Sequence, residues 1–205
     1  MSDAPPDLSS LAGKEIVVGV GGGIAAYKVC DLVSKLVQAD VGVTVAMTDA
    51  AQKFVTPLTF EALTQRPVHT GIWNQVDAAD TQHIKLTEQA DLMIVAPATM
   101  HLLCKCAAGL CDDVVSLLVA AAACPILMAP GMNDRMWANP ATQEAVEKLK
   151  ARGVGFVGPE SGWLACRNEG AGRLVDTTAV LTAATSTMHR HSYSEEDESG
   201  ARGEA

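Results

Sequence analysis

The sequence lacks several features that would place it in a broad functional class. Its 205 residues contain no apolar run as long as a membrane span. Residues 1–10 lack the basic start and the apolar stretch of a signal peptide. A net charge of −9 without a basic stripe argues against a nucleic-acid binder. We therefore expect a cytoplasmic protein with one domain, large enough to form its own hydrophobic core.

The cysteines also lack the spacing of a metal or disulfide site. The six cysteines form no CxxC pair, and Cys104 and Cys106 would point about 200° apart on a helix with 3.6 residues per turn. In a cytoplasmic protein such thiols are expected to be reduced and mostly buried. Cys166 differs because it lies in a glycine-flanked segment, where an exposed thiol can act as an acid or a nucleophile.

Short apolar runs alternate with helical segments along the chain. Runs without polar positions are typical of parallel strands that are buried on both faces, and they cover residues 15–20, 41–47, 91–96, 125–129 and 154–157. Helices are predicted over residues 24–38, 100–109, 112–123 and 140–152. This alternation predicts an α/β fold, a three-layer αβα sandwich around a doubly wound parallel sheet of the Rossmann or flavodoxin-like type.

The two ends of the chain differ from this domain in composition. Residues 1–12 are predicted to be flexible, and residues 13–187 are predicted to form the domain. The glycine-rich residues 158–173 are predicted to be a loop. Residues 188–205 contain the acidic run EEDE and are predicted to be a disordered, solvated tail.

Polar groups and glycines follow the first two predicted strands, and open α/β sheets bind ligands at the carboxyl ends of their strands. Gly21-Gly22-Gly23 precedes a helix, so it is either an anion cradle or simply a tight turn. It does not match the dinucleotide fingerprint, because Ile24 stands where a third glycine is required. Thr48 or Asp49 is expected to cap the next helix, although a hydroxyl there can equally bind a phosphate.

Three more polar residues lie near the ends of the third and fourth strands. His83 precedes the third strand and His101 follows it, and each is either a structural residue or a candidate base. Asn133 either satisfies its own turn or binds a carboxylate. No Ser-His-Asp order and no metal-ligand spacing is present in the sequence. These patterns predict a nucleotide-like ligand but specify no reaction.

Five segments resemble the homo-oligomeric flavin-containing cysteine decarboxylases: GGGIAAYK at 21–28, TDAAQKFVTPLTF at 48–60, HIKL at 83–86, APAT at 96–99 and PGMNDRMW at 130–137. The family includes phosphopantothenoylcysteine decarboxylase of coenzyme A synthesis and the peptidyl-cysteine decarboxylases that modify ribosomal peptides. Residues 158–173 resemble the substrate-clamp loop of the coenzyme A enzyme. The resemblance covers about residues 13–176, and PGMNDRMW is a specific motif.

The resemblance implies FMN as the cofactor and assembly into trimers or dodecamers, with flavin at the subunit contacts. The implied flavin contacts are Gly22, Gly23, Ile24, Thr48, Phe54, Ala98, Thr99, Met100 and Gly131. The implied substrate contacts are Asn133, Met136, Ala165 and Cys166. In addition, His83 is implied as the catalytic base, Asn133 as the residue that binds the substrate carboxylate, and Cys166 as a proton donor.

The implied chemistry accounts for these residue types. If FMN oxidises the substrate thiol to a thioaldehyde, the C=S group lies β to the carboxylate and accepts the electrons released as CO₂ leaves. His83 would take the proton while Asn133 holds the carboxylate. In the coenzyme A enzyme the clamp cysteine then helps to reduce the enethiol, whereas in the peptide enzymes the enethiol is the product.

Three departures from the family pattern bear on the substrate. Met100-His101 follows Thr99 where the family has an Asn-Thr pair, Arg167 replaces a glycine after the clamp cysteine, and an acidic segment stands in place of a fused ligase domain. We therefore expect oxidative decarboxylation of a peptide's C-terminal cysteine to an aminoenethiol, the precursor of aminovinyl-cysteine. The alternatives are phosphopantothenoylcysteine decarboxylase and a non-catalytic, FMN-binding regulatory relative.

Overall fold

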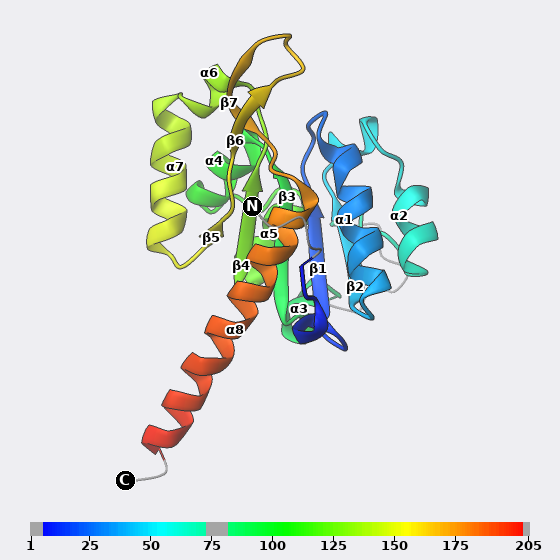
Figure 1. Cartoon of the computed structure of the whole chain (residues 1–205), viewed down its shortest axis with the longest axis vertical. Coiled ribbons are helices and arrows are strands. Elements are labelled where there is room, and N and C mark those ends of the chain that lie inside the picture. The colour runs from blue at the N-terminus through cyan, green and yellow to red at the C-terminus, as the bar shows by residue number, and fades with distance from the viewer. Residues whose placement is uncertain (1–5, 73–81, 203–205) are drawn as a thin grey trace.

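A five-stranded parallel sheet with the order β2-β1-β3-β4-β5 forms the centre of the computed structural model, which describes residues 6–72 and 82–202 (Figure 1). The strands are β1 (Glu15–Val20), β2 (Gly42–Met47), β3 (Leu92–Ala98), β4 (Ile126–Pro130) and β5 (Gly155–Phe156). This is the flavodoxin-like order of a doubly wound sheet. The predicted fold class is confirmed, with small shifts at the strand ends.

Helices cover both faces of the sheet and give two separate hydrophobic cores. One core contains apolar residues of α1 (Ala26–Gln38), α2 (Pro57–Thr64) and α8 (Thr177–Arg202). The other contains apolar residues of α4 (Met100–Ala108), α5 (Val114–Ala121) and α7 (Pro140–Ala151). The shorter helices are α3 (Gln82–Gln89), α6 (Asp134–Trp137), η1 (Ser9–Leu11) and η2 (Ala51–Lys53).

The strands show why their sequences have no polar alternation. In β1, Val18 faces the first core and its neighbour Val17 faces the second. In β3, Ile94 and Val95 divide between the two cores in the same way. Because both faces of the sheet are covered, successive residues on either face need apolar side chains, which gives the continuous runs in the sequence.

The segment 158–173, which the sequence predicts to be a loop, is an antiparallel hairpin of β6 (Glu160–Trp163) and β7 (Glu169–Arg173). The hairpin stands above the carboxyl ends of the central strands (Figure 1). Its glycines and polar residues conceal the strand pattern, and contacts with the neighbouring segment hold it in place. The backbone N–H of Met132 donates to the carbonyl oxygen of Gly172 at 2.8 Å.

Within the described residues, a helical element lies near each end of the chain, η1 at Ser9–Leu11 and α8 at Thr177–Arg202. Leu11, in the segment predicted to be flexible, is fully buried. α8 continues to Arg202, where the sequence predicts a disordered tail from residue 188. The buried residues Leu181 and Ala184 fix the first turns of α8 against the sheet, and a helix that has been nucleated extends readily. Within residues 6–72 and 82–202, no helix has the length and apolar character needed to cross a membrane.

Candidate active site

The glycine turn after β1 lies at the topological switch point, where the chain leaves β1 and β3 towards opposite faces of the sheet. A Cβ on Gly21 would collide with the carbonyl oxygen of Pro97, and one on Gly22 would collide with Ala50. Glycine is therefore required for packing here. Ala25 at the N-cap of α1 offers no capping side chain. In this first turn the backbone N–H of Ala26 donates to the carbonyl oxygen of Gly23 at 2.9 Å, and that of Lys28 donates to the carbonyl oxygen of Ala25 at 3.0 Å.

The end of β3 contributes two side chains through the start of α4. Thr99 is the N-cap residue, and its Oγ1 accepts a hydrogen bond from the backbone N–H of Leu102 at 3.3 Å. His101 follows in the first turn of α4 and is exposed. A capping threonine therefore brings the imidazole to the same edge of the sheet as the glycine turn.

Asn133 satisfies its own turn and also contacts Cys166, while its binding of a carboxylate stays a prediction. Its Oδ1 accepts a hydrogen bond from the backbone N–H of Arg135 at 2.9 Å, which caps α6. Its Nδ2 donates to Sγ of Cys166 at 3.1 Å. The turn thus fixes the orientation of the amide, and the amide nitrogen points to the thiol.

Cys166 lies in the turn of the β6–β7 hairpin and is exposed. The turn is closed by the backbone N–H of Leu164, which donates to the carbonyl oxygen of Asn168 at 2.8 Å. Arg167 has a φ of 64°, a left-handed conformation that favours glycine. The arginine that replaces the family's glycine therefore keeps the backbone conformation for which glycine is suited.

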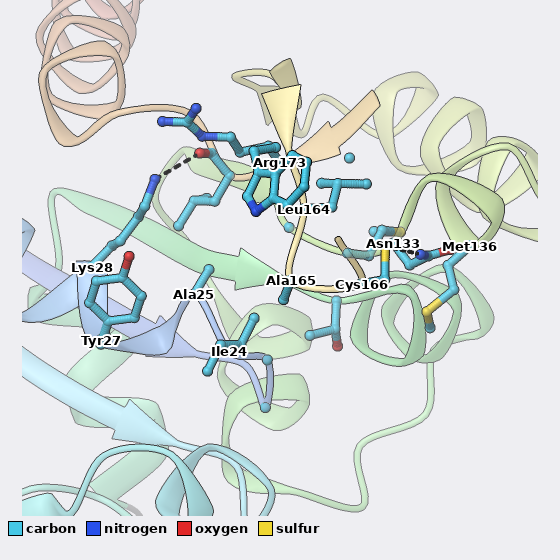
Figure 2. Close-up of a pocket in the computed structure, with 18 of the residues that line it drawn as sticks. Ile24, Ala25, Tyr27, Lys28, Asn133, Met136, Leu164, Ala165, Cys166 and Arg173 are labelled. Carbon is cyan, nitrogen blue, oxygen red and sulfur yellow. Dashed lines mark hydrogen bonds between the residues drawn. The ribbon is translucent and has the colours of Figure 1, made fainter. Parts of the chain in front are cut away.

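A cavity of about 870 Å³ lies between the glycine turn, the start of α4, the start of α6 and the hairpin. Figure 2 shows Asn133, Met136 and Cys166 at one end and Tyr27, Lys28 and Arg173 towards the other. The full lining is Gly22, Gly23, Ile24, Ala25, Tyr27, Lys28, Thr99, His101, Gly131, Met132, Asn133, Met136, Trp163, Leu164, Ala165, Cys166, Gly172, Arg173 and Leu174.

The cavity brings together many of the predicted site residues. All four predicted substrate contacts line it, and so do five predicted flavin contacts: Gly22, Gly23, Ile24, Thr99 and Gly131. The other predicted flavin contacts are outside this lining: Thr48, Phe54, Ala98 and Met100. Thr48 accepts a hydrogen bond at Oγ1 from the backbone N–H of Ala51 at 3.2 Å, but the N-cap residue of η2 is Ala50, not Thr48 or Asp49 as predicted. The role of these four residues in flavin binding stays a prediction.

His83 lies in α3, the helix that precedes β3. The predicted short amphipathic segment is thus helical. The side chain of His83 lies outside the part of the chain that the structure describes, so its role as the base stays a prediction.

Burial separates Cys166 from the cysteines of the core. Burial raises the pKa of Cys106 to about 12 and that of Cys124 to about 11, so both thiols stay protonated near neutral pH. Burial also lowers the pKa of His69, whose backbone pairs with β2.

Among the described residues, no three His, Cys, Asp or Glu side chains are grouped so that they could hold a metal ion.

The sequence patterns did not identify the aromatic and cationic part of the lining. Tyr27 and Lys28 lie one helical turn beyond the glycine turn, so their position could have been inferred from helical periodicity. Trp163 and Arg173 could not, because their orientation depends on a hairpin that the sequence does not reveal.

A cavity at the β1/β3 switch point, beside a glycine turn, defines a flavodoxin-like protein with a nucleotide-type site. The Flavoprotein family model matches residues 6–189, and the chain belongs to this family. It is 44% identical to the coenzyme A biosynthesis bifunctional protein CoaBC of Mycolicibacterium smegmatis over 87% of this chain and 43% of that protein. The CoaBC of Vibrio cholerae is 43% identical over 85% of this chain and 44% of that protein. The chain thus spans less than half the length of these relatives.

Solved structures show the same fold. The FMN-dependent cysteine decarboxylase SpaF is 31% identical, with a TM-score of 0.71 over 85% of this chain and 99% of that chain. The FMN binding protein AtHal3 is 25% identical, with a TM-score of 0.71 over 83% of this chain and 94% of that chain. A PPC decarboxylase mutant complexed with pantothenoylaminoethenethiol has a TM-score of 0.74 over 83% of this chain and 96% of that chain, at 24% identity. The resemblance to the flavin-containing cysteine decarboxylases is confirmed.

Proposed function

We propose that the protein is an FMN-dependent decarboxylase of phosphopantothenoylcysteine. The relatives that are 43–44% identical over most of this chain are coenzyme A biosynthesis proteins, and the family and the FMN-dependent structural neighbours support FMN as the cofactor. These relatives reverse the order of preference that the sequence departures suggested. The peptide substrate becomes the second candidate.

The contact between Asn133 and Cys166 is the observation that carries this function. An amide donor and a thiol meet at 3.1 Å at one end of the cavity. The amide N–H suits a substrate carboxylate, and a carboxylate bound there would bring its neighbouring carbon atoms towards the thiol. An enzyme whose product is the enethiol needs no thiol at this place. An enzyme that reduces the enethiol to a saturated thiol needs a proton donor there.

The residues divide the work as follows. Bound FMN supplies the oxidation of the substrate thiol and, later, the return of the electrons. Asn133 holds the carboxylate until CO₂ leaves, and His83 takes the thiol proton. Cys166 gives a proton to the enethiol, which completes the saturated thiol product.

Oxidative decarboxylation of a cysteine-terminated peptide is the second candidate. SpaF is 31% identical, and the match covers 99% of its chain. Its name describes an FMN-dependent cysteine decarboxylase and specifies no coenzyme A precursor. His101, where the family carries asparagine, lines the cavity and changes the group presented to the substrate.

Mass spectrometry of both reactions tests the proposal. The purified, FMN-loaded protein is incubated with phosphopantothenoylcysteine and, separately, with a peptide that ends in cysteine. We expect loss of CO₂ alone from phosphopantothenoylcysteine and no conversion of the peptide. Loss of CO₂ and two hydrogens from the peptide, with phosphopantothenoylcysteine unchanged, would refute the proposal and establish the second candidate.

A further inference from the structure

Two cations lie at the end of the cavity that is opposite Asn133 and Cys166, and the chemistry described above uses neither of them. Lys28 comes from α1, and Arg173 ends β7, the second strand of the hairpin. Both line the cavity, and Figure 2 shows them on the same side of it. Nζ of Lys28 donates to the carbonyl oxygen of Leu174 at 3.4 Å, which keeps the ammonium group beside the base of the hairpin.

Both cations meet one oxygen atom of Asp176. Oδ1 of Asp176 lies 3.8 Å from Nζ of Lys28 and 3.5 Å from Nη2 of Arg173. A lysine and an arginine that converge on one anionic oxygen are the groups with which proteins bind phosphate. The Asp176 side chain is 71% exposed. Because exposed ion pairs are weak, this carboxylate can be replaced at little cost.

The guanidinium of Arg173 is positioned independently of Asp176. Its Nε pairs with Oε1 of Glu160 at 3.0 Å, across the two strands of the hairpin. The side chain also lies against Gly162, where a Cβ would come within 3.1 Å of Cδ of Arg173. The guanidinium therefore stays in place when Asp176 leaves, so the position for an anion persists.

We propose that Lys28 and Arg173 form an anion subsite for the substrate's phosphate, and that Asp176 fills this subsite as an internal counter-ion until the phosphate displaces it. A phosphate ester carries more charge and more acceptor oxygens than one carboxylate, so it wins the exchange. The proposal rests on the proposed function, because phosphopantothenoylcysteine carries its phosphate at the end remote from the cysteine. A peptide without an acidic group at the corresponding distance does not displace Asp176, which makes the subsite a filter for phosphorylated substrates.

Binding of two ligands that differ only in the phosphate tests the subsite. Phosphopantetheine and pantetheine are titrated calorimetrically into the FMN-loaded full chain and its variants Lys28→Met, Arg173→Met and Asp176→Asn. The matched control is Glu147→Gln, because Glu147 is similarly exposed and pairs with Lys150 at 3.0 Å on the surface of α7.

The wild-type protein should bind phosphopantetheine about tenfold or more tightly than pantetheine, and Lys28→Met or Arg173→Met should remove most of this preference. Asp176→Asn should tighten phosphopantetheine binding about three- to tenfold, because the competing carboxylate is gone, and leave pantetheine binding unchanged. Glu147→Gln should change neither affinity.

Equal affinity of the wild-type protein for the two ligands overturns the subsite. If Asp176→Asn weakens both ligands alike, Asp176 is a structural link of the hairpin and its role as a counter-ion is refuted. Arg173→Lys retains the charge and should keep most of the phosphate preference even where Arg173→Met fails to fold. Since these titrations need no turnover, a protein that does not decarboxylate phosphopantothenoylcysteine would refute the proposed function without affecting the result for the subsite.

Discussion

Asn133 divides its two polar atoms between α6 and Cys166. Oδ1 accepts the backbone N–H of Arg135 at 2.9 Å, and Nδ2 donates to Sγ of Cys166 at 3.1 Å. The capping bond fixes which way the amide points, so the donor is preorganised before a substrate arrives. The same bond explains how a residue with an ordinary structural role in a turn can also carry a binding role.

Replacing Asn133 by aspartate separates the two roles. Aspartate is as good an N-cap residue as asparagine, so Tm should change by only a few degrees. The new carboxylate repels that of the substrate and removes a donor, so kcat/KM should fall about 10²- to 10³-fold. Asn139→Asp is the matched control, because Asn139 caps α7 by accepting the N–H of Ala141 at 2.9 Å. An Asn133→Asp protein with unchanged kcat/KM would contradict the assigned role.

Replacing Cys166 by serine should stop the reaction after CO₂ has left. A serine hydroxyl is a far weaker acid than a thiol, so protonation of the enethiol fails while the earlier steps proceed. Mass spectrometry should find a product two hydrogens lighter than the wild-type product. Cys111→Ser changes a thiol outside the cavity and should give the normal product. Normal product from Cys166→Ser would remove this cysteine from the mechanism.

His83→Asn should abolish turnover and leave a yellow, FMN-loaded protein, because the proposed base acts on the substrate thiol and not on flavin binding. The flavin absorbance of the purified variant and its rate of CO₂ release are measured together. The matched variant is His69→Asn, whose imidazole is half-buried and does not line the cavity. Turnover by His83→Asn at the wild-type rate would refute the role of His83.

The sheet could be predicted from the sequence, because each central strand is buried on both faces and its apolar run has no other simple explanation. The hairpin could not, since its strands alternate glycine with polar residues and gain their order from contacts with α6. Gly170 illustrates this dependence: a Cβ there would lie 2.8 Å from Cβ of Asp134.

The candidate site shows the same division. Asn133 and Cys166 are 33 residues apart and lie in two turns, and only a resemblance to known decarboxylases linked them before the structure placed them at 3.1 Å. Residue patterns alone gave each of them several roles. Lys28 and Arg173 were missed because a shared carboxylate, not a sequence motif, reveals their proximity. The predicted trimer or dodecamer stays a prediction.

His69 should make the stability of the protein depend on pH. Burial lowers the pKa of His69 below its ordinary value of 6.5, so the unfolded chain binds the proton more tightly than the folded one. The resulting stability is present above pH 6.5 and is lost as the pH falls through the lowered pKa. His69→Gln should flatten the decline in unfolding free energy as the pH falls below 6.5, as measured by urea titration. An identical decline in the variant would assign it to other groups.

Arg167→Gly should leave the fold and the activity nearly unchanged. Arg167 has a φ of 64°, which costs a non-glycine residue roughly 1–2 kcal/mol. Glycine removes this strain, but its greater freedom in the unfolded chain offsets about half of the stability gained. Arg167→Val, by contrast, places a β-branched residue in the same conformation. It should displace the turn that carries Cys166 and reduce kcat about tenfold or more, since small displacements of reacting groups are costly.

Gln65 provides the control for this pair of variants. It also has a positive φ, 55°, at the C-cap of α2, and it lies outside the cavity lining. Gln65→Gly and Gln65→Val should change Tm in the same directions as the variants of Arg167 and leave kcat unchanged. If Arg167→Val keeps full activity while Gln65→Val is destabilised, the conformation of the turn does not govern the position of Cys166. Activity that falls only with Arg167→Val shows that the backbone at this residue, and not its side chain, matters for the reaction.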